Sequence, residues 1–367
     1  MIIYIDKYNH ISISKSYKGG IQMKIAFFDT KPYDHKAFEE ANKEYGFEID
    51  YFESRLKKSS VSLTKGYDVV CVFVRDHLDA EVMNKLIENN VKMIALRCAG
   101  YNNVDLVAAQ GKIKVVRVPA YSPYAVAEFT VGMMLTLNRK IHKAYIRTRE
   151  ANFSLNYLTG FDIYQKTIGI IGTGKIAQVL IKILSGFGVQ ILAYDPYPNY
   201  QLSKELGFTY TDLDTLYKQS HIISLHCPLT EETYHLINQE SIEKMRPNVM
   251  IINTGRGKLI DTAALIEGLK NRKIGAAGLD VYEEEDAYFY EDYSSKVIDD
   301  DTLSRLIMFP NVLVTSHQAF LTHEALSNIA HTTLENIYNY SQNKGIAHEV
   351  AYVCDEKGCF VRENKDK

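Results

Sequence analysis

Three side chains with complementary acid–base chemistry lie in the second half of the chain. Each comes directly after a short apolar run: Arg256 after Val249–Asn253, Glu285 after Ala276–Tyr282 and His317 after Val312–Ser316. An arginine can hold a carboxylate through two hydrogen bonds and polarise the neighbouring ketone, while a histidine can donate a proton near neutral pH. A carboxylate beside the histidine favours the imidazolium and orients it. Together they are suited to reducing a 2-oxo acid, although a lone Arg or Glu is usually only a surface charge.

A glycine-rich turn indicates the source of the hydride. Thr167–Ala177 reads T-I-G-I-I-G-T-G-K-I-A, the pattern of a strand, a tight turn and a helix N-terminus. In a dinucleotide site Gly172 makes the turn and Gly174 lets the backbone approach a pyrophosphate, which faces the helix dipole. Such turns also occur as plain connections. Asp195, at the end of the next apolar run, can bind both ribose hydroxyls and repels a 2′-phosphate, so we predict NAD rather than NADP.

Alternating strands and helices must position these groups. A first series of expected strands comprises Lys24–Asp29, Phe47–Phe52, Asp68–Val74, Lys92–Arg97 and Lys114–Val118, with helices at Asp34–Tyr45, Ala80–Asn89 and Asp105–Gly111. A second series comprises Thr167–Ile171, Val189–Asp195, His221–His226, Val249–Asn253, Ala276–Tyr282 and Val312–Ser316. Such alternation predicts an α/β protein with parallel sheets covered on both faces. Tyr124 to Arg149 reads as one long helix, and Phe320 to about Asn343 as another that packs back on the first series.

The composition excludes several functional classes. The 367 residues are 46% hydrophobic and 24% charged with a net charge of −3, so neither nucleic acid nor a membrane surface is an expected partner. No apolar run approaches the roughly 18 residues of a membrane span. Five scattered cysteines favour reduced thiols and a cytoplasmic location. No Cys/His cluster has the spacing of zinc ligands, so no metal is expected.

Both ends of the chain differ from the rest. Met23 begins a clean strand pattern, and Lys18-Gly19-Gly20 can be encoded by a purine-rich stretch upstream of it, as in a bacterial ribosome-binding site. Residues 1–22 are therefore interpreted as a mis-called start, with a real mobile extension as the alternative; the intact mass of the native protein decides. The tail of residues 350–367 is polar and is expected to be loosely held.

Several motifs together resemble one known family. They are Leu96–Asp105 (LRCAGYNNVD), Val118–Pro123 (VPAYSP), Gly172–Ala177, His226–Thr230, Asn253–Asp261, Leu279–Glu285 and His317–Phe320. With them the chain is similar to the D-isomer-specific 2-hydroxyacid dehydrogenases from Met23 to about Glu349. The resemblance implies a flavodoxin-like substrate domain (23–121 plus 318–349) and a Rossmann NAD-binding domain (122–317), with the active-site cleft between them.

The resemblance also implies roles for individual residues. Arg256 binds the substrate carboxylate and carbonyl, His317 donates the proton and Glu285 pairs with His317. Backbone N–H groups around Ala99 and Gly100 hold the carboxylate. The positions at which the family contacts NAD are Gly172, Gly174, Lys175, Ile176, Asp195, Cys227, Pro228, Thr233, Thr254, Gly255 and Asp280.

The substrate is expected to be small. Phe73, Tyr101, Tyr121 and Phe320 match positions that can line the pocket, and bulky rings leave room for a methyl group more readily than for a long chain. Pyruvate is therefore the expected substrate, and longer branched 2-oxo acids are the alternative. A non-catalytic NAD(H)-sensing module on the same fold is the rival from another class. The long helix at 124–149 makes a homo-oligomer reasonable.

Overall fold

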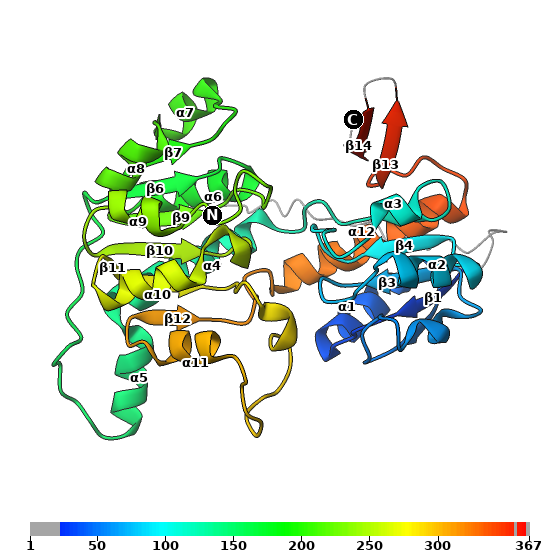
Figure 1. Ribbon diagram of the computed structural model, residues 1–367, viewed down its shortest axis with the longest axis horizontal. Coiled ribbons are helices and arrows are strands. Elements are labelled where there is room, and N and C mark those ends of the chain that lie inside the picture. The colour runs from blue at the N-terminus through cyan, green and yellow to red at the C-terminus, as the bar shows by residue number, and fades with distance from the viewer. Residues whose placement is uncertain (1–22, 356–357, 365–367) are drawn as a thin grey trace, which may run out of the picture. The chain divides into compact units, whose positions relative to one another are not determined.

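The computed structural model describes residues 23–355 and 358–364, which fall into two compact units (Figure 1). One unit contains the described residues up to Tyr121 and from Thr322 on, and the other is Ser122–Leu321. Within these ranges no helix is long and apolar enough to cross a membrane, and no three His, Cys, Asp or Glu side chains are grouped to hold a metal ion. The hypothesis about residues 1–22 lies outside the described residues.

The first unit is built on a five-stranded parallel sheet. In the order β2-β1-β3-β4-β5, its strands are Glu48–Tyr51, Lys24–Phe27, Val69–Val72, Met93–Leu96 and Lys114–Val116. This is the doubly wound order of flavodoxin-like sheets. The helices are α1 (Pro32–Asn42), η1 (Val61–Thr64), α2 (Ala80–Glu88), α3 (Leu106–Ala109) and α12 (His323–Ser341). Every residue of β3 and β4 is buried, because helices cover both faces of the sheet.

The second unit carries a seven-stranded parallel sheet. In the order β12-β11-β10-β9-β6-β7-β8, its strands are Val312–Val314, Ile274–Leu279, Val249–Asn253, Ile222–Leu225, Thr167–Ile171, Gln190–Tyr194 and Thr209–Tyr210. Its helices are α4 (Pro123–Arg139), α5 (Ile141–Arg149), α6 (Lys175–Ser185), α7 (Tyr200–Leu206), α8 (Leu213–Gln219), α9 (Gln239–Lys244), η2 (Gly257–Leu259), α10 (Thr262–Lys270), η3 (Glu285–Ala287) and α11 (Asp301–Met308). The strand order reverses between β6 and β9, as in dinucleotide-binding sheets. The predicted fold class is confirmed, although the two-residue edge strand β8 was not foreseen.

The single long helix predicted for Tyr124 to Arg149 is wrong. The segment forms α4 and α5, separated by Lys140 in the left-handed conformation with φ +52°. One side of α4 is buried in its unit, where the helix packs against α6. By contrast, α5 has no buried residue, so no packing holds it in line with α4.

The C-terminal segment is also more ordered than predicted. Val350–Asp355 (β13) and Gly358–Glu363 (β14) pair as an antiparallel hairpin, in which Cys354 lies opposite Cys359 and is joined to it by a disulfide. The hairpin packs against α3 and β5. The expectations of a loose end and of reduced thiols are therefore wrong for residues 350–355 and 358–363, whereas Cys71, Cys98 and Cys227 form no disulfide.

Candidate active site

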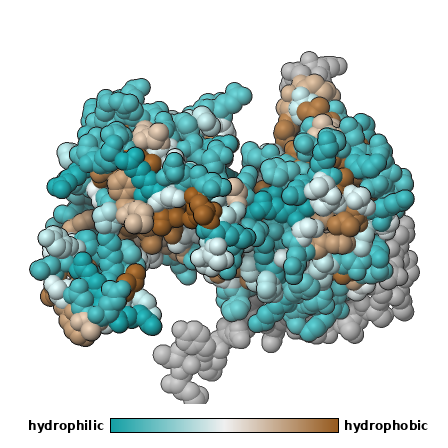
Figure 2. All heavy atoms as spheres, turned by 60° about the horizontal axis from the view of Figure 1, so that its bottom comes forward, coloured by the Kyte–Doolittle hydropathy of each residue, from teal (hydrophilic) through white to brown (hydrophobic). Residues whose placement is uncertain are grey.

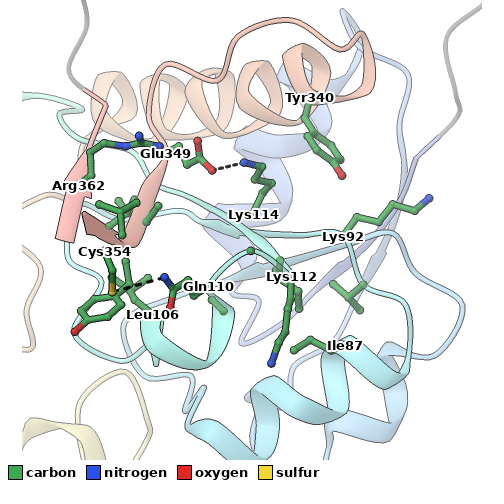
Figure 3. A pocket seen from close by; sticks show the side chains of 18 of the residues that line it. Ile87, Lys92, Leu106, Gln110, Lys112, Lys114, Tyr340, Glu349, Cys354 and Arg362 are labelled. Atoms are coloured by element: carbon green, nitrogen blue, oxygen red, sulfur yellow. Dashed lines mark hydrogen bonds and ion pairs between the residues drawn. The ribbon is translucent and has the colours of Figure 1, made fainter. Parts of the chain in front are cut away.

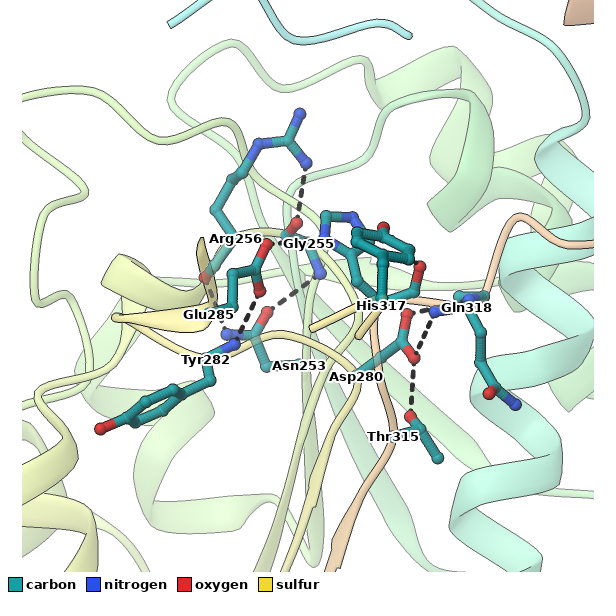
Figure 4. A network of polar contacts seen from close by, with 11 residues as sticks. Asn253, Gly255, Arg256, Asp280, Tyr282, Glu285, Thr315, His317 and Gln318 are labelled. Atoms are coloured by element: carbon teal, nitrogen blue, oxygen red, sulfur yellow. Dashed lines mark hydrogen bonds and ion pairs between the residues drawn. The ribbon is translucent and has the colours of Figure 1, made fainter. Parts of the chain in front are cut away.

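The three side chains predicted to do chemistry follow three neighbouring strands of the second unit (Figure 4). Arg256 follows β10, Glu285 opens η3 after β11, and His317 follows β12. Because β10, β11 and β12 are parallel and adjacent, their carboxyl ends share one edge of the sheet. Ligands of open α/β sheets bind at this edge.

Glu285 and His317 form a hydrogen-bonded pair. The Nδ1 atom of His317 lies 2.7 Å from Oε1 of Glu285, and Oε2 accepts the backbone N–H of Tyr282 at 2.9 Å. Both side chains are only 17% exposed. The carboxylate thus serves two donors at once. Since Nδ1 is engaged, a proton given to a substrate would leave from Nε2 of His317.

The backbone of His317 has a strained conformation, with φ +51°. Its N–H donates to the Asp280 carbonyl at 2.7 Å, and its own carbonyl accepts the Tyr290 hydroxyl at 2.9 Å. A non-glycine residue keeps such a conformation only where its surroundings hold it there. Hydrogen bonds at both ends of the residue therefore fix the direction of the imidazole.

Asp280 anchors the turn that carries His317. Its Oδ1 accepts from the Thr315 hydroxyl at 2.6 Å and from Gln318 N at 2.9 Å, and its Oδ2 accepts from Ala319 N at 2.9 Å. The side chain has no exposed surface. Burial raises the pKa of Asp280, and its hydrogen bonds oppose that rise. The sequence predicted that Asp280 contacts the cofactor, whereas in the structure its carboxylate accepts hydrogen bonds from Thr315, Gln318 and Ala319.

Arg256 extends from the loop after β10 (Figure 4). Its Nη1 donates to the Gly255 carbonyl at 2.8 Å, and the loop is closed by Asn253, whose Nδ2 donates to the Arg256 carbonyl at 2.9 Å. Gly257 is required next, because a Cβ there would lie 2.1 Å from the Tyr282 carbonyl. Within the described residues the guanidinium makes no other hydrogen bond, so its remaining N–H groups are available to an anion.

The turn after β6 has the features that a dinucleotide requires. Gly172 has φ +91°, and a Cβ there would lie 2.7 Å from His226 and Cys227 backbone atoms. Gly174 is the N-cap of α6, and a Cβ on it would meet nothing within 4 Å. The helix N-terminus is therefore open to an anion, and the residues present fit the pyrophosphate of NAD.

Asp195 lies beside this turn. Its Oδ2 accepts from the N–H and the hydroxyl of Thr173 at 2.8 and 2.9 Å, and its Oδ1 accepts from Tyr197 N at 3.0 Å. The carboxylate thereby joins the end of β7 to the glycine turn. Burial raises the pKa of the nearby Cys227 to about 11, so this position presents a neutral thiol.

The remaining predicted cofactor positions lie at the same edge of the sheet. Lys175 and Ile176 open α6, Pro228 follows β9 and accepts the Thr233 hydroxyl at 2.7 Å, and Thr254 and Gly255 follow β10. The Thr254 hydroxyl lies 3.1 Å from that of Thr130 on α4. All the predicted cofactor positions therefore follow strands at this edge, and of these Asp280, directly after β11, has no exposed surface.

The first unit carries most of the predicted substrate positions. Phe73 follows β3, Ala99, Gly100 and Tyr101 follow β4, and Tyr121 follows β5. The Asn103 amide donates to the Phe73 carbonyl at 2.8 Å, which ties the loop after β4 to the loop after β3. Phe320 belongs to the other unit, where it is buried.

Sequence reasoning missed the residues that hold these groups in place. Tyr290 and Thr315 support the His317 turn, while Arg117 and Glu363 support the loop at Ala99. Thr315 could have been suspected from its place two residues before His317. The other three act across long sequence separations, and no local pattern marks them.

Comparisons with known proteins identify the family of the chain. A family model described as "D-isomer specific 2-hydroxyacid dehydrogenase, NAD binding domain" matches residues 131–319. A 2-hydroxyacid dehydrogenase homolog of Haemophilus influenzae is 57% identical over 323 residues, 88% of this chain and 97% of the relative. The D-lactate dehydrogenase of Escherichia coli is 53% identical over 329 residues, 89% of this chain and 100% of the relative. The apo-structure of that enzyme matches with a TM-score of 0.82 at 51% identity, covering 89% of this chain and 99% of its own.

Proposed function

This chain belongs to the D-isomer-specific 2-hydroxyacid dehydrogenase family, and from that premise we propose that it reduces pyruvate to D-lactate with NADH, reversibly. The observation that carries the proposal is the placement of Arg256, Glu285 and His317 at one edge of a sheet that also bears a dinucleotide turn. The relative of E. coli origin, named a D-lactate dehydrogenase, supports the choice of substrate.

NAD would be held along the carboxyl edge of the second sheet. The open N-terminus of α6 at Gly174 suits the pyrophosphate, and Asp195 suits the ribose hydroxyls. The segments at 227–233 and 254–255 complete the edge. We assign Asp280 to anchoring the His317 turn, because its carboxylate is buried and already accepts three hydrogen bonds. When bound, NADH supplies the hydride.

The catalytic roles follow from the chemistry of each side chain. Arg256 would grip the substrate carboxylate and polarise the ketone, which stabilises the negative charge that develops on the oxygen. His317 would donate its Nε2 proton to that oxygen. Glu285 would keep the imidazolium oriented through Nδ1, which lies 2.7 Å from its carboxylate. In the oxidative direction the same groups act in reverse.

The substrate loop of the first unit would supply backbone N–H groups at Ala99 and Gly100 to the carboxylate. Phe73, Tyr101, Tyr121 and Phe320 would limit the size of the 2-oxo acid. A methyl group is the smallest side chain that such rings can accept, so pyruvate is favoured over 4-methyl-2-oxopentanoate.

Kinetics with a substrate panel test the proposal. NADH oxidation is measured with pyruvate, 2-oxobutyrate and 4-methyl-2-oxopentanoate, and the product is resolved by chiral chromatography. We expect the highest kcat/KM with pyruvate and D-lactate as product. A preference for the longer acid would replace the substrate assignment. NADH binding without turnover of any of these acids would favour the NAD(H)-sensing module.

We also propose a cytoplasmic homo-oligomer assembled through the segment after α4. The surface in Figure 2 is mainly hydrophilic with separate hydrophobic patches, whereas Ile141, Tyr145, Phe153, Leu155 and Tyr157 are all more than half exposed in one stretch. Light scattering of the wild type and of Phe153→Asp/Leu155→Asp tests this: a dimer that becomes a monomer supports the proposal, and a monomeric wild type contradicts it.

A further inference from the structure

The C-terminal hairpin is attached to the loop that follows β4. Glu363, the last residue of β14, accepts the Tyr101 hydroxyl on Oε1 at 2.9 Å and the Arg117 Nη2 on Oε2 at 2.7 Å. The Arg117 guanidinium also lies over the Tyr101 ring, 5.4 Å from its centroid. One carboxylate thus holds two partners, and both are only partly exposed to solvent.

Arg117 links Glu363 to the Ala99–Gly100 peptide, which is predicted to bind the substrate carboxylate. Its Nη1 donates to the Ala99 carbonyl at 2.7 Å. In a trans peptide the carbonyl of one residue and the N–H of the next point in opposite directions. Holding the Ala99 oxygen therefore aims the Gly100 N–H away from Arg117. Within the described part of the chain this N–H has no protein acceptor, so it is available to a substrate carboxylate.

The hairpin that supplies Glu363 is a two-stranded ribbon, and such a ribbon by itself is marginally stable in water. Its strand β13 packs against α3 and β5, and β14, which carries Glu363, pairs with β13. Cys354 and Cys359 are exposed and closed into a disulfide. Cys354 lines a cavity of about 740 Å³, in which the Gln110 amide lies 3.9 Å from its sulfur (Figure 3). A small thiol can therefore reach the bond from solvent.

We propose that the Cys354–Cys359 disulfide is a redox modification site that controls affinity for the 2-oxo acid, because the closed hairpin holds Glu363 on Arg117 and Tyr101. A small dithiol supplies two electrons and two protons; the sulfur–sulfur bond breaks, two protein thiols form, and the dithiol closes into its own disulfide. Reduction loosens the hairpin, releases Glu363 and frees the Ala99–Gly100 peptide to turn. The inference rests on the proposed function of that peptide.

The exposure of the disulfide supports a regulatory role. Cys354 and Cys359 are both exposed, and exposed disulfides are the ones that are reduced readily and serve as regulatory sites. Cys71, Cys98 and Cys227 form no disulfide, so a mild reductant breaks only the Cys354–Cys359 bond among the described residues. Reduction therefore has one target in this part of the chain.

Steady-state kinetics of the full chain test the link. KM for pyruvate is measured for the oxidised protein and after treatment with dithiothreitol, with thiols counted by alkylation and mass. Reduction should raise KM roughly threefold to tenfold with KM for NADH unchanged, the effect of losing one charged hydrogen-bond network. Glu363→Gln and Cys354→Ser/Cys359→Ser should show the raised KM in both redox conditions. Glu349→Gln, which loses the carboxylate that binds Lys114 at the foot of the hairpin, is the matched control and should respond like the wild type.

Two results would overturn the proposal: an unchanged KM on reduction of the wild type, or a Glu363→Gln variant that still responds to reduction. Hydrogen exchange over residues 98–104 provides a readout that needs no substrate. Faster exchange on reduction supports the link, and unchanged exchange contradicts it. If pyruvate is not reduced in either redox state, the proposed function fails, while this exchange experiment still decides whether the hairpin controls the loop.

Discussion

Replacing Glu285 by Gln should move the pH dependence of pyruvate reduction. His317 must carry a proton to reduce the ketone, so kcat/KM should fall as pH rises and the imidazolium is lost. The Glu285 carboxylate lies 2.7 Å from Nδ1 in a site where both side chains are 17% exposed. Removing an opposite charge at such a distance disfavours the charged imidazolium. The alkaline fall of kcat/KM should therefore move to lower pH.

The amide should also weaken the local structure, for a reason visible in the hydrogen bonds. The carboxylate accepts from both His317 Nδ1 and Tyr282 N, whereas Gln has one acceptor oxygen and an NH₂ group that would face a donor. While His317 carries a proton on Nδ1, one of the two donors loses its partner whichever way the amide turns, at about 1–3 kcal/mol. Thermal unfolding of the Glu285→Gln variant measures this cost separately from the pH profile.

The assay is NADH oxidation at subsaturating pyruvate from pH 5 to 9. Glu284→Gln is the matched control, because it removes the neighbouring charge from an exposed side chain. Its profile should coincide with that of the wild type. The role of Glu285 is refuted if its variant also follows the wild-type profile, or if Glu284→Gln shifts the profile equally.

Three other changes test separate parts of the structure. Arg256→Lys keeps the charge but loses the planar guanidinium that forms two hydrogen bonds, so kcat/KM for pyruvate should fall roughly 100-fold. The affinity for NADH, measured by NADH fluorescence, should stay unchanged. An equal loss of kcat/KM and of NADH affinity would mean that Arg256 acts on the cofactor. Tyr290→Phe removes the hydroxyl that donates to the carbonyl of His317, whose backbone is strained, and should lower kcat roughly threefold to tenfold without changing NADH affinity. Tyr293→Phe is its control: that hydroxyl donates to the Ala287 carbonyl, and its loss should leave kcat unchanged. Burial raises the pKa of Asp76 to about 7, so between about pH 4 and 7 the folded state keeps a proton that the unfolded chain has lost. The free energy of unfolding should therefore decrease as pH rises through that interval, and urea titrations of Asp76→Asn should show a flatter dependence.

Much of the fold follows from local sequence patterns. The runs at Thr167–Ile171 and Val249–Asn253 coincide with β6 and β10, because buried parallel strands are continuous apolar stretches bounded by polar residues. The glycine turn can also be predicted from the sequence, because Gly172 has a positive φ and the surrounding backbone leaves no space for a Cβ. Such features depend on a few neighbouring residues.

The remaining features depend on contacts between distant parts of the chain. The break at Lys140 has no Gly or Pro to mark it, and it arises where the packing of α4 ends. The hairpin contains strand-favouring residues at Val350–Val353 and Phe360–Val361, but the pairing across Cys354 and Cys359 and the attachment of Glu363 to Arg117 join residues that no local pattern connects. In the same way, Tyr290 reaches the His317 carbonyl across 27 residues. A single sequence carries no signal for such pairings.

The discontinuity of the first unit has a consequence for synthesis on the ribosome. Its sheet is complete by Val116, but α12 and the hairpin are made only after the 200 residues of Ser122–Leu321. The second unit is one continuous segment and can fold as soon as it emerges, whereas the first must wait with its sheet incompletely covered. A chain that stalls before α12 should therefore leave a folded nucleotide-binding unit joined to an aggregation-prone partner, so the nascent protein most needs a chaperone until α12 and the hairpin have been made.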